Sequence, residues 1–241
     1  MTVSGEPATI ERAQGLGGGE LVLRRDGEHY EIISNGMFLM DTRNGESERL
    51  LISAAVAGLG EDRADAPVRV LIGGLGVGFS LAEALRRPGV DAVTVVEIEP
   101  AVVGWHRTLL RPFSEGALDD PRVNVVRADL LEWLAEPPRE GPFDAICLDI
   151  DNGPDWTVTP SNAHLYGGTG LDLLVRRLSS RGVLAVWSAG AAPAFEELLR
   201  GRFDQVRVRP VPVPRGEPDV IYLARDPRGS RGGAQPVQGT P

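Results

Sequence analysis

The stretch Val70–Gly78, which reads VLIGGLGVG, decides the fold that we expect for this chain. An apolar run typical of a buried strand ends in closely spaced glycines, and residues 79–86 then have the pattern of a helix. Glycine allows a tight turn and lets the backbone come close to a ligand. This order of strand, glycine turn and helix is typical of nucleotide-binding α/β folds, although such a turn can also be purely structural.

The spacing of the glycines favours one class of ligand. Gly74, Gly76 and Gly78 form the pattern G-x-G-x-G, whereas the dinucleotide fingerprint has its third glycine where this chain has Phe79. The loop therefore favours an adenosyl-sulfonium ligand over NAD. We take these residues of the loop as cofactor-binding candidates: Gly73, Gly74, Gly76 and Gly78.

Strand-like apolar runs alternate with helical stretches around and beyond this loop. Such alternation predicts βαβ units and a mostly parallel sheet that is buried on both faces, which is a Rossmann-like α/β fold. Two final runs, residues 203–208 and 220–224, flank a proline-rich turn and are expected to close the sheet as an antiparallel pair. The alternating runs cover residues 68–72, 92–98, 123–126, 143–150 and 183–187.

A small β unit is expected before the main sheet. The dipeptides Asp26-Gly27 and Asn35-Gly36 separate short apolar runs and are strong hairpin signals. Both ends of the chain are rich in glycine and have little to bury, which predicts flexibility. The expected organisation is a flexible N-terminus (1–19), a small β unit with a connecting helix (20–60), a Rossmann-like nucleoside-binding domain (61–225) and a flexible tail (226–241).

Composition excludes several classes of function. The chain has 241 residues, a formal net charge of -9 and a pI near 4.9, so it would repel a nucleic-acid backbone and suits a small or cationic substrate. Cys147 is the only cysteine and lies in an apolar run, which excludes a disulfide and a multi-cysteine metal site. Because no apolar stretch is long enough to span a bilayer, we expect a cytoplasmic protein without a membrane or metal partner.

Acidic residues follow the second and third strands of the predicted sheet. Glu97 ends a strand about 20 residues beyond the glycine loop, where a carboxylate can accept hydrogen bonds from both ribose hydroxyls. Glu99 competes for that role, but its position fits a charge at the start of a helix. Asp129 can accept a hydrogen bond from an adenine amino group, and it also suits a helix N-cap. Asp129 and the preceding Ala128 are therefore cofactor-binding candidates.

The fourth strand ends in a further acidic turn. Ligands of open α/β sheets lie beyond the carboxyl ends of the strands, so a carboxylate here points at the reactive end of the ligand. Asp149 continues an apolar run into an acid and is the catalytic candidate. Asp151 and Asn152 follow it and are substrate-binding candidates, although Asx-turn chemistry also explains them.

These motifs, in this order, resemble the spermidine synthase (polyamine aminopropyltransferase) family over about residues 20–225. The resemblance implies a small N-terminal β domain and a sheet of the S-adenosylmethionine-dependent methyltransferase type. It also implies transfer of an aminopropyl group from decarboxylated S-adenosylmethionine to an amine, with release of methylthioadenosine. By resemblance, Gly74 and Gly76 line the nucleoside, Glu97 holds the ribose, Asp129 the adenine, and Asp149 the attacking amine.

The chain departs from the family at three places. Gly76 stands where the family has the acid that binds the donor's amine, so discrimination against intact S-adenosylmethionine is expected to fall. The family's Tyr-Gln pair, part of the polyamine tunnel, falls on Glu48-Arg49, and a Gln of the preceding strand falls on Leu39. Arg49 would repel a diamine or pair with a carboxylate. Alternatively, Glu48 and Arg49 lie on a solvated helix face.

Residues after the acidic turn are expected to fold over the substrate as a gate. Trp156 is the preferred candidate there, with Tyr166 and His164 as weaker ones that also suit a core or a helix start. Three functions remain open: aminopropyl transfer, methyl or aminocarboxypropyl transfer from intact S-adenosylmethionine, and non-catalytic nucleoside binding. The acceptor is expected to be a small amine, and a homodimer is compatible with the sequence.

Overall fold

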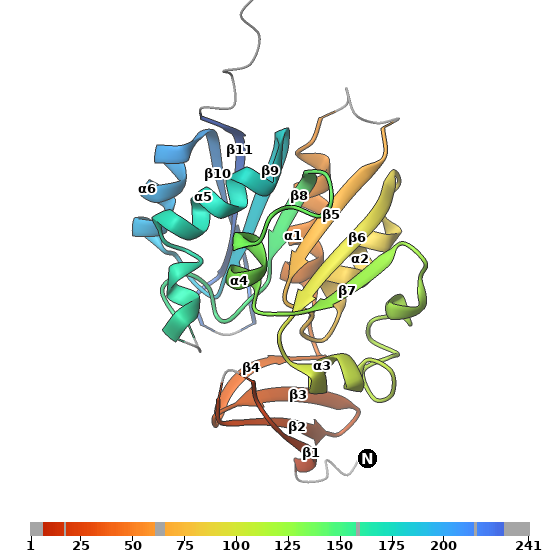
Figure 1. Cartoon of the computed structure of the whole chain (residues 1–241). Coiled ribbons are helices and arrows are strands. Elements are labelled where there is room, and N and C mark those ends of the chain that lie inside the picture. The colour runs from red at the N-terminus through yellow and green to blue at the C-terminus, as the bar shows by residue number, and fades with distance from the viewer. Residues whose placement is uncertain (1–6, 17, 61–65, 158–159, 215, 229–241) are drawn as a thin grey trace, which may run out of the picture.

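The computed structural model describes residues 7–16, 18–60, 66–157, 160–214 and 216–228, which form two β-sheets (Figure 1). The smaller sheet is antiparallel, with the strand order β1-β2-β3-β4. The larger sheet has seven strands in the order β10-β11-β9-β8-β5-β6-β7. The small sheet lies below the large one, at the edge where the parallel strands end (Figure 1).

The strands of the small sheet are β1 (Ala8–Gln14), β2 (Glu20–Asp26), β3 (His29–Ser34) and β4 (Met37–Asp41). Those of the large sheet are β5 (Val68–Gly73), β6 (Val90–Glu97), β7 (Val123–Arg127), β8 (Phe143–Leu148), β9 (Leu178–Ser188), β10 (Phe203–Val211) and β11 (Asp219–Pro227). The helices are α1 (Glu46–Ala57), α2 (Phe79–Arg86), α3 (Pro100–Trp105), α4 (Leu130–Ala135), α5 (Gly168–Arg177) and α6 (Pro193–Arg202), with short 3-10 helices η2 (Ala117–Asp119) and η3 (Pro160–His164).

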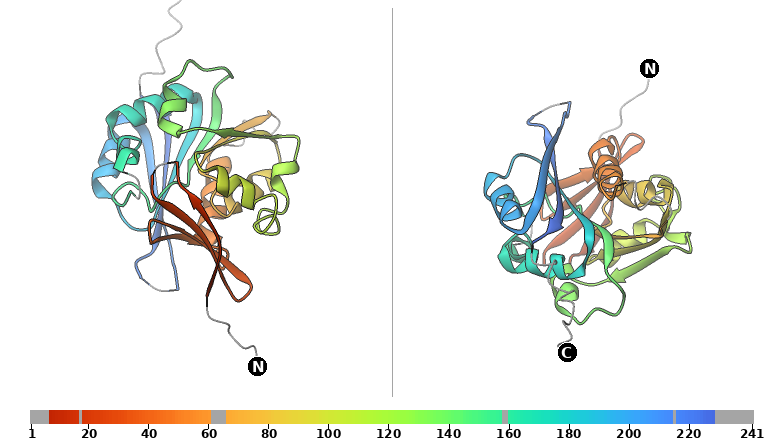
Figure 2. Two further views of the ribbon diagram at one scale, coloured as in Figure 1. Left: turned by 60° about the horizontal axis from the view of Figure 1, so that its bottom comes forward. Right: turned by 90° about the horizontal axis from the view of Figure 1, so that it is seen from above.

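The large sheet confirms the predicted Rossmann-like α/β fold. Strands β7, β6, β5, β8 and β9 are parallel, whereas β11 pairs antiparallel with β9 and with β10. Helices cover both faces (Figure 2). One core layer contains Leu51 of α1 and Leu81 of α2, and the other contains Leu171 of α5 and Phe195 of α6. Because both faces are buried, the central strands are apolar throughout, which explains the continuous runs in the sequence.

The hairpins of the small sheet form where the sequence predicts them. Asn35 and Gly36 both have positive φ values, 52° and 79°, as a two-residue turn with the favoured twist requires. The Asn35 side chain also accepts a hydrogen bond from the backbone N–H of Glu20 at 2.8 Å. Leu23 and Ile32 lie in the main hydrophobic core, so one face of the small sheet packs against that core. The small sheet therefore packs as part of the molecule's core.

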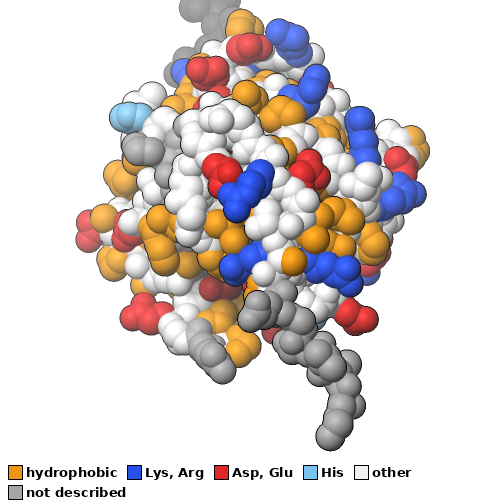
Figure 3. All heavy atoms as spheres, turned by 90° about the horizontal axis from the view of Figure 1, so that it is seen from below, with side chains coloured by type: hydrophobic (Ala, Val, Ile, Leu, Met, Phe, Trp, Pro, Cys, Tyr) orange, Lys and Arg blue, Asp and Glu red, His pale blue; other side chains and the backbone are white. Residues whose placement is uncertain are grey.

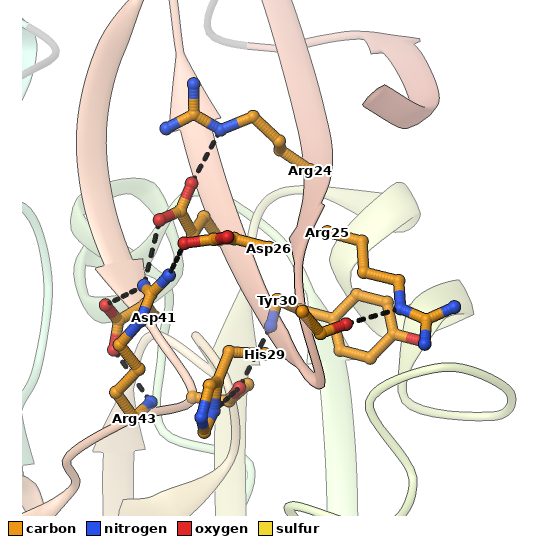
Figure 4. A network of polar contacts seen from close by, with 10 residues as sticks. Arg24, Arg25, Asp26, His29, Tyr30, Asp41 and Arg43 are labelled. Carbon is orange, nitrogen blue, oxygen red and sulfur yellow. Dashed lines mark hydrogen bonds and ion pairs between the residues drawn. The ribbon is translucent and has the colours of Figure 1, made fainter. Parts of the chain in front are cut away.

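A charged network connects three strands of the small sheet to the chain that enters α1 (Figure 4). Arg43 forms ion pairs with Glu31, Asp41 and Asp26, and Arg24 forms a second ion pair with Glu31. Glu31 is buried, and although burial opposes it, hydrogen bonds from Arg43 and Arg24 lower the pKa of its carboxyl. The two arginines on one buried carboxylate therefore connect the small sheet to the segment that enters α1.

The predicted boundaries of the two flexible ends, at residues 19 and 226, are wrong, because regular strands extend beyond them. Residues 8–14 form β1, which pairs with β2, although its side chains are almost all exposed. Backbone hydrogen bonds hold such an edge strand, so a composition with little to bury does not reveal it. At the other end, Asp226 and Pro227 still belong to β11. Residues 1–6, 17 and 229–241 lie outside the described residues.

Among the residues that the structure describes, no helix has the length and apolarity needed to cross a membrane. Within the same residues, no group of three or more His, Cys, Asp and Glu side chains is arranged to hold a metal ion.

Candidate active site

A cavity of about 530 Å³ lies between the small sheet and the carboxyl ends of the parallel strands. The small sheet contributes an apolar wall that includes Leu21, Ile32, Leu39 and Met40. The opposite wall is polar and comes from the loops that follow β5, β6, β7 and β8. It contains these predicted site residues: Gly74, Gly76, Glu97, Ala128, Asp129, Asp149 and Asp151. The fold therefore places seven predicted residues around one space.

The glycine loop at the end of β5 has backbone angles that favour glycine. Gly74, Gly76 and Gly78 have φ values of 86°, 52° and 89°. A Cβ on Gly74 would lie 2.4 Å from the carbonyl oxygen of Asp149, so the loop approaches the acidic turn too closely for a side chain. Gly78 precedes the first residue of α2, and neither it nor Gly73 lines the cavity. These two glycines therefore shape the loop from outside the cavity.

His106 supports the glycine loop from behind and was missed by the sequence reasoning. Its Nε2 lies 2.8 Å from the carbonyl oxygen of Gly76, and its ring is almost fully buried. Burial lowers the pKa of His106, so the neutral ring donates from Nε2 to that carbonyl. A lone histidine with no partner nearby in the sequence carries no signal that would have revealed this role.

Glu97 lies at the end of β6, as predicted, and its side chain is buried. Its two carboxylate oxygens accept hydrogen bonds from the backbone N–H groups of Leu75 and Glu99, each at 2.8 Å. Burial raises the pKa of Glu97, and these backbone hydrogen bonds oppose that effect. Each oxygen retains a lone pair for a second donor. The carboxylate is thus held between the glycine loop and the start of α3, at the wall of the cavity.

Glu99, the competing acid, has a structural role as well as a place at the cavity wall. Both of its carboxylate oxygens lie 3.1 Å from the backbone nitrogen of Leu16 in the β1–β2 connection. Glu99 also precedes the first residue of α3, although its side chain makes no capping hydrogen bond. Its side chain therefore ties the small sheet to the main sheet, which differs from the expected solvated charge.

Asp129 caps α4, as one of its two predicted roles requires. Its Oδ1 accepts hydrogen bonds from the N–H groups of Leu131 at 2.8 Å and Glu132 at 3.1 Å. Both bonds involve the same oxygen, and Asp129 also lines the cavity. The preceding Ala128 donates its N–H to the carbonyl of Glu97, which keeps the ends of β6 and β7 side by side. Capping orients the carboxylate without using both of its oxygens.

Asp149 follows β8 at the floor of the cavity. Its Oδ2 accepts a hydrogen bond of 2.8 Å from the hydroxyl of Ser80, in the first turn of α2. Burial raises the pKa of Asp149 to about 6, the bond from Ser80 opposes this, and the charge of Asp219 adds to it. A carboxylate with a pKa near neutrality is suited to accept a proton from an amine. The sequence identified Asp149 but neither Ser80 nor Asp219, which lie on other elements.

Glu48 is buried beside Asp149, which contradicts the interpretation that it lies on a solvated helix face. It belongs to the first turn of α1, and its Oε2 accepts a hydrogen bond from Ser47 at 2.9 Å. Burial and the charge of Asp149 raise the pKa of Glu48 to about 7. Arg49 packs its guanidinium over the ring of Phe79, 4.3 Å from the centroid. Neither Glu48 nor Arg49 lines the cavity.

The turn after Asp149 is held by its own hydrogen bonds. Asp151 has a positive φ of 56°, lines the cavity and accepts a hydrogen bond from Asn162 at 2.8 Å. Asn152 is buried, with backbone bonds to Trp156 and Ala189. Asp151 therefore lies at the cavity wall, whereas Asn152 holds the turn through its backbone.

The aromatic candidates of the gate do not line the cavity. Tyr166 is buried and donates its hydroxyl to the carbonyl of Ile150 at 2.8 Å, so it supports the acidic turn from the core. Trp156 is 55% exposed and His164 is also exposed. Residues 158 and 159 of the expected gate lie outside the described residues. Substrate contact by these aromatic residues remains a prediction.

Comparison with known protein families matches a part of the chain that contains the glycine loop and the acidic residues of the cavity. The family model described as "Spermine/spermidine synthase domain" matches residues 51–194. A polyamine aminopropyltransferase of Mycobacterium tuberculosis (strain ATCC 25618 / H37Rv) is 35% identical over 170 residues, which cover 69% of this chain and 30% of the relative. Polyamine aminopropyltransferase 1 of Streptomyces coelicolor is 43% identical over 121 residues, which cover 49% of this chain and 22% of the relative.

Solved structures show the same fold. A spermidine synthase in complex with the transition-state analogue AdoDATO superposes with a TM-score of 0.73 at 20% identity, covering 91% of this chain and 74% of that chain. Spermidine synthase from Thermotoga maritima gives a TM-score of 0.71 at 19% identity, covering 91% and 73%. The chain spans less than a third of the length of the mycobacterial relative. On the strength of the family model, which covers more than half of its residues, the chain belongs to the spermine/spermidine synthase family.

Proposed function

We propose that the chain transfers an aminopropyl group from decarboxylated S-adenosylmethionine to a small amine and releases methylthioadenosine. The observation that carries this proposal is that one cavity joins Gly74, Glu97 and Asp129 to Asp149. The first three residues suit a nucleoside, and the last suits an amine. The polyamine aminopropyltransferases among the relatives support the same reaction.

The residues of the cavity have distinct tasks in this reaction. Glu97 would accept hydrogen bonds from the ribose hydroxyls, and Asp129 would accept one from the adenine amino group. Asp149 would take a proton from the acceptor's ammonium group, which leaves a free amine. The nitrogen lone pair then forms a bond to the donor's methylene carbon while the carbon–sulfur bond breaks. The electron pair of that bond stays on sulfur as a neutral thioether, and the proton passes from Asp149 to solvent.

The charges around the cavity favour the decarboxylated donor. The ionisable residues that line it are the acids Glu97, Glu99, Asp129, Glu132, Asp149 and Asp151 and the base Arg127. Such an excess of acids attracts an ammonium group and opposes an extra carboxylate. The glycine at position 76 removes one acid from the loop but leaves this imbalance in place. Arg49 packs on Phe79 outside the cavity lining, so it does not supply a partner for the carboxylate of intact S-adenosylmethionine.

The experiment that tests this proposal offers both donors to the purified protein with a series of diamines and triamines. We expect methylthioadenosine to form with the decarboxylated donor and an amine, and to be detected by chromatography with mass spectrometry. The matched control is Asp149→Asn, which should bind methylthioadenosine but not form it. Formation of S-adenosylhomocysteine from intact S-adenosylmethionine instead would establish a methyltransferase and overturn the proposal.

The proposal includes a cytoplasmic enzyme that forms a homodimer through the small sheet. Strands β1 and β4 are the edges of that sheet, and Ile10, Met37 and Phe38 on them are exposed. Hydrophobic side chains are visible on this side of the molecule (Figure 3). A second copy would cover this apolar surface. Sedimentation of the unmodified protein and of Phe38→Ser tests this, because the substitution should favour the monomer.

A further inference from the structure

Glu48 is a buried acid that does not line the cavity. Its carboxylate is buried in the first turn of α1, with 8% of the residue exposed. Ser47 donates a hydrogen bond to Oε2 at 2.9 Å. The backbone N–H of Glu48 itself is a second donor. A buried carboxylate whose hydrogen-bond donors are all neutral is costly to ionise unless a cation is close.

Ser80 connects Glu48 to the catalytic candidate. Its hydroxyl donates to Asp149 at 2.8 Å and lies 3.4 Å from the backbone carbonyl oxygen of Glu48. Helix α1 also packs against β8, the strand that Asp149 follows, and against α2, which carries Ser80. Glu48 and Asp149 therefore share one buried environment, although 100 residues separate them in the chain.

The other ionisable groups that act on this pair are acidic. Asp219, at the start of β11, adds negative charge to both carboxylates, while Trp187 and Ser47 bond to it. Burial and the charge of Asp149 raise the pKa values of the Cys147 thiol on β8 and of the Tyr166 hydroxyl, so both groups stay neutral. On α1 itself, Arg49 places its guanidinium over the ring of Phe79.

Without a nearby cation, ionisation of both carboxylates in such a site is unfavourable. Burial, followed by the charge of Asp149, raises the pKa of Glu48 to about 7. Burial raises the pKa of Asp149 to about 6, with a smaller contribution from the charge of Asp219. Ser80 stabilises the ionised form of Asp149, so the shared proton resides mainly on Glu48. The proton belongs to the pair because the two titrations are coupled.

We propose that Glu48 is a positioning residue that acts through Asp149: the two carboxylates share one proton in the empty site and release it when a cationic amine binds. Asp149 then meets the amine as an ionised base, and the empty site avoids two uncompensated buried charges. This inference rests on the proposed function, because it assigns Glu48 a task toward the amine acceptor.

The test is isothermal titration calorimetry of the complex with methylthioadenosine, using 1,4-diaminobutane as the probe. Titrations in buffers of different ionisation enthalpy give the number of protons released per diamine bound. The pH is set at about 6.5, between the two pKa values, where the unmodified pair holds about one proton. We expect the unmodified protein to release about one proton from the pair and Glu48→Gln to release about a quarter of a proton or less, because Asp149 alone is then mostly ionised.

Glu46→Gln is the matched control, since Glu46 lies in the same turn of α1 but is exposed. It should release as many protons as the unmodified protein. Glu48→Asp keeps a carboxyl group and should restore part of the release that Glu48→Gln loses. The glutamine keeps an oxygen that can accept from Ser47, and unchanged binding of methylthioadenosine shows that the variant is folded.

The outcomes separate the inference from the proposed function. Equal proton release by the unmodified protein and Glu48→Gln, with the diamine bound by both, overturns the inference alone. Failure of the diamine to bind the unmodified complex, while methylthioadenosine still binds, overturns the proposed function and the inference with it.

Discussion

Replacing Glu48 by glutamine should stabilise the protein at alkaline pH. The folded-state pKa of Glu48 is raised to about 7 from an ordinary value of 4.5, so the folded chain holds a proton that the unfolded chain has lost. The unmodified protein therefore loses stability as the pH rises from about 4.5 to about 7, and it does not regain it above that range. Glutamine is neutral at every pH and is free of this loss.

The magnitude follows from the shift of the pKa. A difference of about 2.5 units between the folded and unfolded states corresponds to about 3 kcal/mol of unfolding free energy at pH 8. At about pH 5.5 the difference in unfolding free energy falls to about 1 kcal/mol. At this pH Glu48 is protonated in the folded chain, whereas in the unfolded chain the ratio of its ionised to its protonated form is only about ten. For a chain of this size, about 3 kcal/mol raises the melting temperature by about 6 to 12 °C.

The assay is urea unfolding, followed by circular dichroism, of the unmodified protein and Glu48→Gln at about pH 5.5 and about pH 8. Glu46→Gln serves as the control, because removal of an exposed charge on the same helix turn should change the free energy of unfolding little at either pH. If the variant and the unmodified protein differ by the same amount at both values, Glu48 does not titrate in the folded chain as we infer.

The remaining predictions test the ligand cavity. Glu97→Ala should weaken binding of methylthioadenosine by about 1 to 3 kcal/mol in calorimetry, because the ribose loses a charged acceptor, and unchanged affinity in the folded variant would count against the site. Asp149→Asn should bind methylthioadenosine normally but lose turnover, because an amide does not accept the amine's proton, and normal turnover would refute that role. Gly76→Asp should weaken nucleoside binding, because the φ of 52° favours glycine and a Cβ there would lie 2.4 Å from the Met40 sulfur. Addition of Met40→Ala should relieve the contact and restore part of the affinity; equal affinities of both variants would contradict this.

Local patterns in the sequence were enough to predict the main sheet and the acidic residues that follow its strands. The glycine loop, Glu97 and Asp149 each follow a continuous apolar run, and strands buried on both faces leave such runs in the sequence. Because the carboxyl ends of parallel strands meet at one edge, these residues were expected to share a ligand site before any coordinates were known. The hairpin turn at Asn35 is equally local, since it requires positive φ values over two residues.

Other features depend on contacts between distant segments. Strand β1 is held by backbone pairing while its side chains stay exposed, so no periodicity in the sequence marks it. Met40 fills the space in front of Gly76 only because the small sheet packs against the edge of the large one.

The protonation of the acidic turn is likewise a tertiary property. The helical pattern around Glu48 is compatible with a solvated face, and only the packing of α1 against α2 and the large sheet buries this residue beside Asp149. Ser80 and Asp219 reach the same site from two further elements. Local sequence specifies which carboxylate follows each strand, whereas the fold brings carboxylates from different elements into one buried environment, because desolvation and charge repulsion depend on distance in space.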